Sequence, residues 1–430
     1  MNRTRHPRVR IIVAAMAISW CALGNAAQDA AAGSSSVAHV ATDASPSTFA
    51  FNGFGTLGVV HSSEQNADFT STTFKPNGAG HTHAWSAAVD SSLGAQLTAN
   101  FTPRLSAVLQ LIAKQNYDDS YRPVVEWANI KYQFTPDASV RVGRIELPLF
   151  LLADSRQVGY VSPWVRPPSE VYNVVPITNN DGIDASYRMH VGDLTDTVSA
   201  AYGRSYRVHF PAGSSIEVRD LRGLISKTEY GAALFNLSYV AGHISLQPVI
   251  ALFDAFREFG PPGQAIANRY ELIGKLTTIV SAGASYDPGK WFATAEWTEF
   301  DSHSFLGVNT GWYVSGGYRI VQFTPYLTYS ALTVASMSAA GLDAAALPPS
   351  LSGSARALNA GLDAILRERA VQRTLSAGTR WDFAKNVDLK LQFDHTRLGP
   401  SSPGTLINLQ PGFRPGGTVN LFSAAVDFVF

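Results

Sequence analysis

The sequence of 430 residues has a single cysteine, Cys21, and few charged side chains. One cysteine cannot form an intramolecular disulfide, so the fold cannot be stabilised by disulfide bonds as small secreted domains are. Charged residues make up 15% of the chain, with 33 basic and 33 acidic groups, whereas an average globular protein has about 25%. The balanced charge and the lack of a basic patch argue against a nucleic-acid partner.

The N-terminus has the pattern of a secretory signal peptide. Four arginines in "MNRTRHPRVR" precede an apolar stretch, Ile11 to Leu23, and the small residues of "GNAAQDA" follow. Basic, apolar and small-residue regions in this order are typical of exported chains. An N-terminal membrane anchor is the alternative, but the apolar run is too short to span a bilayer comfortably. We therefore expect residues 1–26 to be removed and residues 27–49, rich in Ala and Ser, to form a flexible periplasmic segment.

Long apolar runs are absent after the N-terminus, which excludes membrane-spanning helices of about twenty apolar residues. Aromatic residues nevertheless make up 11% of the chain, and it contains 35 glycines. Only helices and closed β-barrels satisfy every backbone polar group in lipid. An exported membrane protein of this composition is therefore expected to be a β-barrel.

Apolar and polar residues alternate in many segments between residue 50 and residue 430. In "VDLKLQFDHT", for example, Val387, Leu389 and Leu391 alternate with Asp388 and Lys390. Period two places the two sets on opposite faces of a strand. The last segment, "NLFSAAVDFVF", alternates in the same way and carries aromatic residues on one face. Recurring segments of about ten such residues are typical of transmembrane β-barrels.

The connections between these segments alternate between short and long. The short ones contain the Pro, Gly, Asn and Asp of tight turns and cover residues 101–104, 135–139, 190–193, 228–231, 287–290, 321–324 and 383–386. The long ones cover about residues 63–82, 117–123, 147–180, 207–219, 242–268, 303–308, 335–368 and 399–416. Seven turns and eight loops predict an all-β, antiparallel transmembrane barrel of about sixteen strands over residues 50–430. Its turns would face the periplasm and its loops the cell exterior.

Two of the long loops have helical periodicity. "SLQPVIALFDAFREFG" places Val249, Leu252, Phe253 and Phe256 at helical spacing, and "SGSARALNAGLDAILRERA" does the same with several leucines. Plug-like packing in the barrel mouth and binding of a partner are both open interpretations. Aromatic girdles are expected at the membrane interfaces, with the candidates Phe54, Trp127, Tyr132, Trp291, Trp297, Trp312, Tyr318, Trp381 and Phe422.

Taken together, the leader, the alternating strands, the eight loops and the terminal phenylalanine resemble Gram-negative outer-membrane porins. The resemblance implies a water-filled channel for passive diffusion of small hydrophilic solutes and ions, without catalytic activity or a cofactor. It implies homotrimers, surrounding outer-membrane lipid and lipopolysaccharide, and a third loop folded into the lumen as a constriction. It also implies that the barrel-assembly machinery reads the last strand, through Phe422, Phe428 and Phe430.

The third loop, residues 147–180, is the main candidate for the functional site because long loops in compact domains are usually functional or disordered. In place of the Pro-Glu-Phe-Gly-Gly motif of enterobacterial general porins it has "VRPPSEVY", which leaves the pore geometry and the solute class open. If the loop folds inward, its polar residues would face basic residues of the wall. These candidates are Asp154, Arg156, Arg166, Glu170, Asn179, Asn180 and Asp181.

Strand alternation also predicts which charges line the lumen, because Arg or Lys facing lipid near the midplane costs about 2–4 kcal/mol. Rings of charge set the ion preference of a pore, and the inward bases modestly outnumber the acids, which favours a weak anion preference. The wall candidates are Arg104, Lys114, Lys131, Arg141, Arg188, Lys275, Glu296, Arg319, Arg380 and Lys390.

Two other functions stay open. An outer-membrane lipase or protease would need a serine or aspartate beside a histidine at the barrel rim, and a closed structural or adhesive barrel would use the helical loops. Metal binding is not expected, because His81 and His83 have no third ligand evident in the sequence. The histidines that an enzyme could use are scattered along the chain, at His61, His209, His243, His303 and His395.

Overall fold

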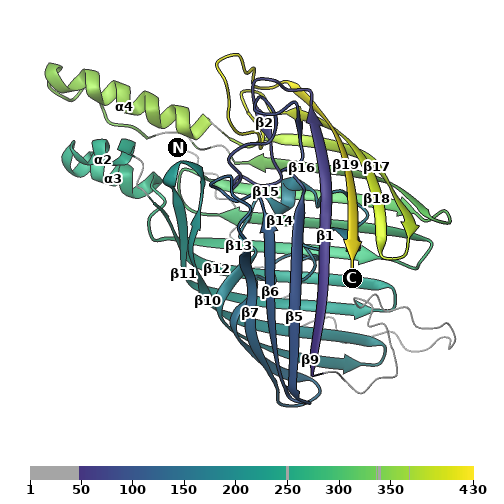
Figure 1. Ribbon diagram of the computed structural model, residues 1–430. Helices are drawn as coiled ribbons and strands as arrows, with labels where there is room; N and C mark the ends of the chain where they lie inside the picture. The colour runs from purple at the N-terminus through teal and green to yellow at the C-terminus, as the bar shows by residue number, and fades with distance from the viewer. Residues whose placement is uncertain (1–47, 248–250, 336, 338–339, 368) are drawn as a thin grey trace. The chain divides into compact units, whose positions relative to one another are not determined.

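A computed structural model describes residues 48–247, 251–335, 337, 340–367 and 369–430 of the chain. Sixteen long antiparallel strands close into a barrel in which each strand pairs with the next and β19 pairs with β1 (Figure 1). The predicted fold class is therefore confirmed. The expected signal peptide and nearly all of the periplasmic segment lie outside the described residues.

The barrel strands are 9 to 16 residues long. They are β1 (Phe49–Ser62), β5 (Ser92–Thr102), β6 (Leu105–Lys114), β7 (Val124–Gln133), β8 (Ala138–Glu146), β9 (Asn179–Val191), β10 (Leu194–His209), β11 (Ser215–Tyr230), β12 (Ala233–Gln247), β13 (Lys275–Tyr286), β14 (Trp291–Asp301), β15 (Val308–Tyr318), β16 (Phe323–Val334), β17 (Gln372–Ala384), β18 (Val387–Leu398) and β19 (Thr418–Val429). The first long loop adds the short strands β2 (Asp68–Phe69), β3 (Ala79–Gly80) and β4 (Trp85–Ser86).

All seven short turns lie where the sequence predicts them, at one end of the barrel, and the eight long loops connect the strands at the other end. Local chemistry explains the turns. Gly192 and Gly231 adopt φ angles of +59° and +54° in two of them, a conformation that glycine adopts without steric cost. Asn386 adopts a φ of +63° in the last turn, where asparagine is tolerated better than most residues.

The two faces of each strand differ as the alternation predicts. In β18, Asp388 and Lys390 are fully buried toward the lumen, whereas Leu391 and Phe393 are 39% and 47% exposed on the outer face. The outer face of the barrel therefore consists mainly of apolar side chains. Among the girdle candidates, Phe54 does not belong to this face, because it is only 6% exposed and its ring packs inside, over Gly94.

The seam between the first and last strands shows how the terminal phenylalanine is accommodated. The backbone amide of Gly53 donates to the carbonyl oxygen of Phe430 at 2.8 Å, and the amide of Phe430 donates to the carbonyl oxygen of Gly53 at 2.9 Å. The Phe430 ring lies over Gly53 and the Phe428 ring over Gly55, so that a Cβ at position 53 would be 2.1 Å from a ring carbon. Glycines in β1 thus allow two aromatic rings to lie flat across the seam.

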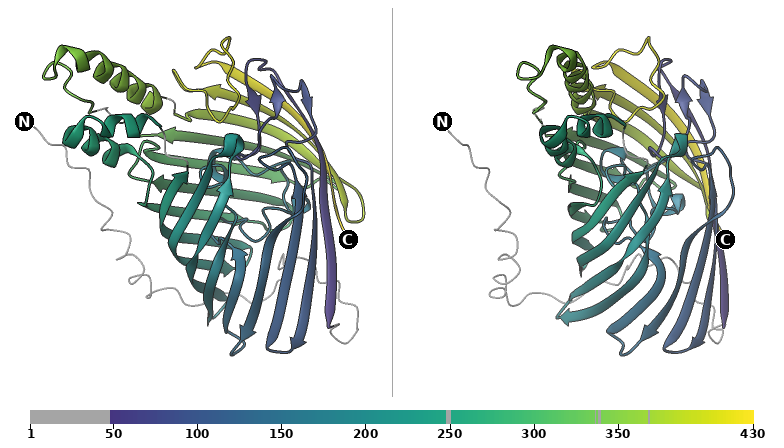
Figure 2. Two further views of the ribbon diagram at one scale, coloured as in Figure 1. Left: turned by 60° about the vertical axis from the view of Figure 1, so that its left-hand side comes forward. Right: turned by 90° about the vertical axis from the view of Figure 1, so that its left-hand side faces the viewer.

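Helices form in both loops that have helical periodicity. The fifth loop contains α2 (Ala251–Arg257) and α3 (Gly260–Tyr270), and the seventh contains α4 (Pro349–Arg367); Val249 lies outside the described residues. The three helices share an apolar cluster that includes Phe253, Phe256 and Leu362 and extend beyond the strand ends at the long-loop end (Figure 2). They pack on one another rather than filling the lumen. Within the described part of the chain, no helix has the length and apolarity needed to cross a membrane.

Candidate functional site

The third long loop, residues 147–178 (loop 3), folds into the barrel and packs against its inner wall. Its apolar side chains, including Leu149, Phe150 and Trp164, form one buried cluster with inward-facing residues of β11 to β16. Ring contacts contribute, since the Trp164 and Tyr313 centroids are 5.8 Å apart in an edge-on arrangement. Burial of this apolar surface holds loop 3 against one side of the lumen. The wall residues of the cluster are Val218, Leu221, Val240, Ile244, Ile279, Phe292, Phe300, Tyr313 and Tyr326.

Hydrogen bonds fix the first part of loop 3 to β12 and β14. The carbonyl oxygen of Leu149 accepts from Ser238 Oγ at 2.8 Å. Glu296 of β14 accepts from the Leu151 amide at 2.8 Å and from the Tyr172 hydroxyl at 2.9 Å. Glu296 therefore points into the lumen, where it joins the two ends of loop 3 to the wall.

The tip of loop 3 is hydrogen-bonded to β17 and β18, close to the seam. Lys390 of β18 donates to the carbonyl oxygen of Gly159 at 2.7 Å and forms an ion pair with Asp427 at 2.8 Å. Arg380 donates to the carbonyl oxygen of Tyr160 and is 3.2 Å from Asp388. Gly159 permits this close approach, because a Cβ there would lie 2.1 Å from an Asp427 oxygen.

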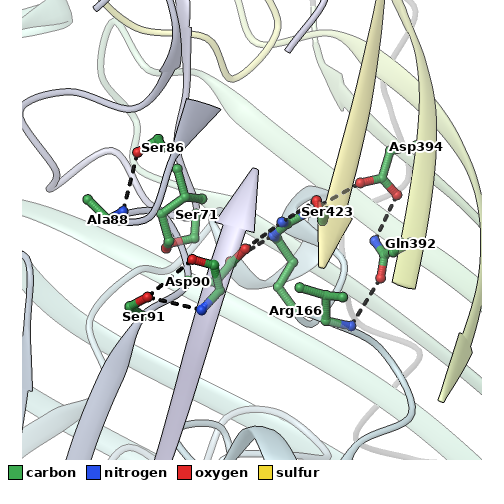
Figure 3. A network of polar contacts seen from close by, with 12 residues as sticks. Ser71, Ser86, Ala88, Asp90, Ser91, Arg166, Gln392, Asp394 and Ser423 are labelled. Atoms are coloured by element: carbon green, nitrogen blue, oxygen red, sulfur yellow. Dashed lines mark hydrogen bonds and ion pairs between the residues drawn. The ribbon is translucent and has the colours of Figure 1, made fainter. Parts of the chain in front are cut away.

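Arg166, which follows the tip of loop 3, forms hydrogen bonds and ion pairs with several residues at once (Figure 3). Its guanidinium donates to both carboxylate oxygens of Asp90, at 2.9 and 2.6 Å, to Asp394 at 3.2 Å and to Ser423 Oγ at 2.7 Å. The arginine is 8% exposed. Gln392 connects this network to the loop backbone, because its Oε1 accepts from the Val165 amide at 3.1 Å and its Nε2 donates to Asp394 at 2.7 Å.

These pairs correct the expected polarity of the contact, because the cation belongs to loop 3 and the carboxylates to β18 and to the segment before β5. Glu170 likewise accepts from the neutral side chains of Gln372 and Thr374. Only Asp154 follows the expectation, with Lys227 of β11 at 3.3 Å.

Three of the predicted constriction residues lie in β9 rather than in the loop, since β9 begins at Asn179. Asn180 is 1% exposed and shares the strand face of Asp184. Asp181 alternates with them, on the same face as the outward Ile183, and forms an ion pair with Arg144 of β8 at 2.7 Å. Asp181 therefore belongs to the outer rim of the barrel and not to a constriction.

The predicted wall residues divide into two groups. The first group occupies inward-facing strand positions and consists of Lys114, Lys131, Arg141, Arg188, Glu296, Arg380 and Lys390. Arg141, for example, donates to Asp184 at 3.0 Å and to Glu146 at 2.9 Å. Arg104, Lys275 and Arg319 do not line the lumen, because they lie at strand ends. Arg319 pairs with Asp287 beside a turn, Lys275 donates to the carbonyl oxygen of Asn268 in α3, and Arg104 lies exposed in the first turn.

Loop 3 leaves an open cavity on the side of β1 and β5 to β7. This cavity, the vestibule, has a volume of about 510 Å³ and is lined by the first, second and third loops together with those strands. One loop residue reaches across to the opposite wall. Gln157 accepts from Lys114 Nζ of β6 at 3.3 Å and donates to Glu126 of β7 at 3.3 Å.

Gln157 and Glu126 were not among the residues predicted from the sequence. The register between β6 and β7 shifts between the pairs Gln110–Trp127 and Leu111–Val125. Such a bulge changes which residues face inward, so strict alternation along β7 misassigns Glu126. The sequence carries no local signal for Gln157.

The histidines that an enzyme could use are dispersed in the structure. His61 stacks on Trp85, and His209 stacks on Tyr117. His395 is 2.8 Å from Asn420 Oδ1, while His243 and His303 are each near one aspartate. In the part of the chain that the structure describes, no three His, Cys, Asp or Glu residues are grouped as metal ligands would be. These arrangements give no support to a catalytic set at the rim.

Comparisons with known proteins agree with the fold. No family model and no curated protein matches the sequence. The outer-membrane channel DcaP of Acinetobacter baumannii is 12% identical, with 90% of this chain and 99% of that chain covered and a TM-score of 0.53. OmpF of Salmonella typhi, solved in complex with daunomycin, is 12% identical, with 89% and 97% covered and a TM-score of 0.51. At this identity the likeness shows a porin-like fold.

Proposed function

We propose that this protein is an outer-membrane porin, a passive channel for small hydrophilic solutes and ions without catalytic activity. The observation that carries the proposal is the position of loop 3 inside a closed barrel. Loop 3 is anchored to β11–β19 and leaves a cavity with charged lining residues beside β1 and β5–β7. A lumen that is narrowed but not filled is the arrangement expected of a diffusion channel.

The proposal includes the setting of the channel. We include in the proposal that the N-terminal signal exports the chain and that the assembly machinery inserts the last strand. The proposal also includes contact with lipopolysaccharide and a homotrimer. The exposed apolar outer face supports a membrane location, since a soluble protein rarely exposes large contiguous apolar patches. The long loops would then lie outside the cell and the short turns in the periplasm.

Single-channel recording tests the proposal. Refolded protein, with folding checked by heat-modifiable gel mobility, is added to a planar bilayer. We expect discrete current steps, in groups of three for a trimer, and a reversal potential under a salt gradient that reports the ion preference. A silent membrane with folded protein would overturn the channel function and favour a closed structural barrel.

Gln157→Ala is expected to increase the single-channel conductance. The glutamine side chain joins loop 3 to Lys114 and Glu126 on the opposite wall, so its removal widens the passage between them. The matched control is Gln133→Ala, because Gln133 donates to the carbonyl oxygen of Thr135 at 2.7 Å in a turn distant from loop 3. Equal conductance in wild type and both variants would show that the passage lies elsewhere.

A further inference from the structure

The vestibule carries an unequal set of charges. Among its lining residues are five cations and three carboxylates, namely Lys75, Lys114, Arg122, Arg156 and Arg166 against Asp90, Asp118 and Glu126. Two of the cations are neutralised by ion pairs, since Arg122 pairs with Asp118 and Arg166 with Asp90. The remaining cations are Lys75 from the first loop, Lys114 from β6 and Arg156 from loop 3.

Uncharged oxygens hold these three cations in place. Lys75 Nζ donates to the carbonyl oxygens of Ala88 and Val89, the latter at 2.7 Å. Lys114 Nζ donates to the amide oxygen of Gln157 at 3.3 Å. Arg156 donates to the carbonyl oxygens of Tyr172 and Val175, at 2.6 and 3.3 Å. Within the described residues, no ion pair joins any of the three to a carboxylate.

The arrangement leaves both charge and hydrogen-bond donors unused. An ammonium has three N–H donors and a guanidinium five, more than these neutral acceptors occupy. Glu126 is the one carboxylate of the vestibule without an ion pair, and its partner is Gln157. Cations that are partly removed from water and form no ion pair are costly, and a bound anion would supply a direct partner for them.

Lys75 shows this cost most clearly. It is 4% exposed, and burial lowers its pKa to about 7. Burial is the largest cause, Asp90 opposes it, and Lys114 and Arg166 add to it, which places Lys75 within electrostatic range of Lys114. Lys114 lies in turn within electrostatic range of Arg156, so Lys114 is the central member of the three.

We propose that the vestibule is a binding site for small dianions, such as dicarboxylates or phosphate-bearing solutes, with Lys75, Lys114 and Arg156 as the ligand-binding residues. The inference rests on the proposed channel function and specifies its substrate class. A volume of about 510 Å³ lies within the usual range of small-molecule sites. Cations from the first loop, β6 and loop 3 can contact a dianion from different sides before it passes Gln157.

The test is the block of chloride current by sulfate, succinate and inorganic phosphate in planar bilayers. We expect each dianion to reduce the current through wild-type channels in a saturable way. The double variant Lys75→Met with Arg156→Gln should need at least a tenfold higher concentration for half block. The matched control is Lys290→Met with Arg356→Gln, which removes the same charges from a turn and from the exposed face of α4, and it should behave as wild type.

The outcomes separate this inference from the channel function. Channels that conduct but show equal block in wild type and the double variant, or no block, would overturn the dianion site and leave the porin intact. If the membrane is silent, titration calorimetry of the detergent-folded protein with sulfate still decides. Binding that the double variant weakens would support the site without a channel, and no binding would overturn it.

The block by sulfate should also depend on pH, because sulfate keeps its charge across the range tested while Lys75 does not. Lys75 is protonated below its pKa of about 7 and neutral above it, so we expect stronger block at pH 6 than at pH 8.5. The charged groups that face Lys75 are Asp90, Lys114 and Arg166. In Lys75→Met the difference between the two pH values should disappear; a difference that persists would assign the titration to another group.

Discussion

Replacing Arg166 by methionine is expected to destabilise the folded barrel by about 3–5 kcal/mol, because removing one partner of a buried ion pair leaves uncompensated charge. Asp90 and Asp394 would each lose their bound cation, and both are nearly inaccessible to solvent in the structure. The change also removes the hydrogen bond to Ser423. Loop 3 would then lose the bonds that Arg166 makes to β18, β19 and the segment before β5.

Urea unfolding of detergent-solubilised protein, followed by tryptophan fluorescence, measures this loss. Arg122→Met is the matched control, because its ion pair with Asp118 involves an arginine side chain that is 77% exposed, and such exposed pairs contribute little to stability. In the Arg166→Met background, the further substitutions Asp90→Asn and Asp394→Asn should restore part of the stability, because they remove the two unpaired carboxylates. Equal effects of Arg166→Met and Arg122→Met would contradict the buried network.

Gly53→Ala is expected to weaken barrel closure by about 1–3 kcal/mol, the usual cost of inserting a methyl group into a packed contact. The new Cβ would lie 2.1 Å from the Phe430 ring, so the ring must leave the seam or the strands must separate. We expect a lower yield of the compact, heat-modifiable form and a lower urea midpoint.

Two comparisons isolate the ring contact. Gly316→Ala adds a methyl group to a strand glycine whose nearest neighbour would be 3.5 Å away, so it should be tolerated. In a Phe430→Ala background, Gly53→Ala should cost little, and the double-mutant cycle then measures the coupling between the two residues. Additive effects of the two substitutions would mean that the ring does not lie on Gly53.

The barrel itself could be predicted from the sequence because its signals are local. Period-two alternation along segments such as β18 and β19 fixes which face is apolar, and turn residues such as Gly192 and Asn386 mark where strands reverse. The positions of the helices in the fifth and seventh loops follow from local periodicity as well. The strands, turns and loop helices can therefore be predicted without knowing which residues far apart in the sequence are in contact.

The interior of the lumen depends on distant contacts, and there the sequence was insufficient. Phe292, Tyr313 and Tyr326 face inward and pack on loop 3, although aromatic residues in the same strands also face outward, as Trp312 does. Arg166 could have paired with wall or loop carboxylates, and only the fold shows that Asp90 and Asp394 bind it. A single bulge in β7 hides Glu126, and Asp181 was assigned to the loop because the start of β9 has no turn signal.

The cross-lumen bonds of loop 3 have a consequence for the order of folding. Its partners come from both ends of the barrel sequence, with Thr56 and Asp90 near the first strands and Asp394 and Asp427 in the last two. Bringing such distant segments together is entropically costly until the strands between them have paired. Loop 3 can therefore complete these contacts only on a closed barrel, so an assembly intermediate with an open seam would hold the loop less tightly than the mature protein does.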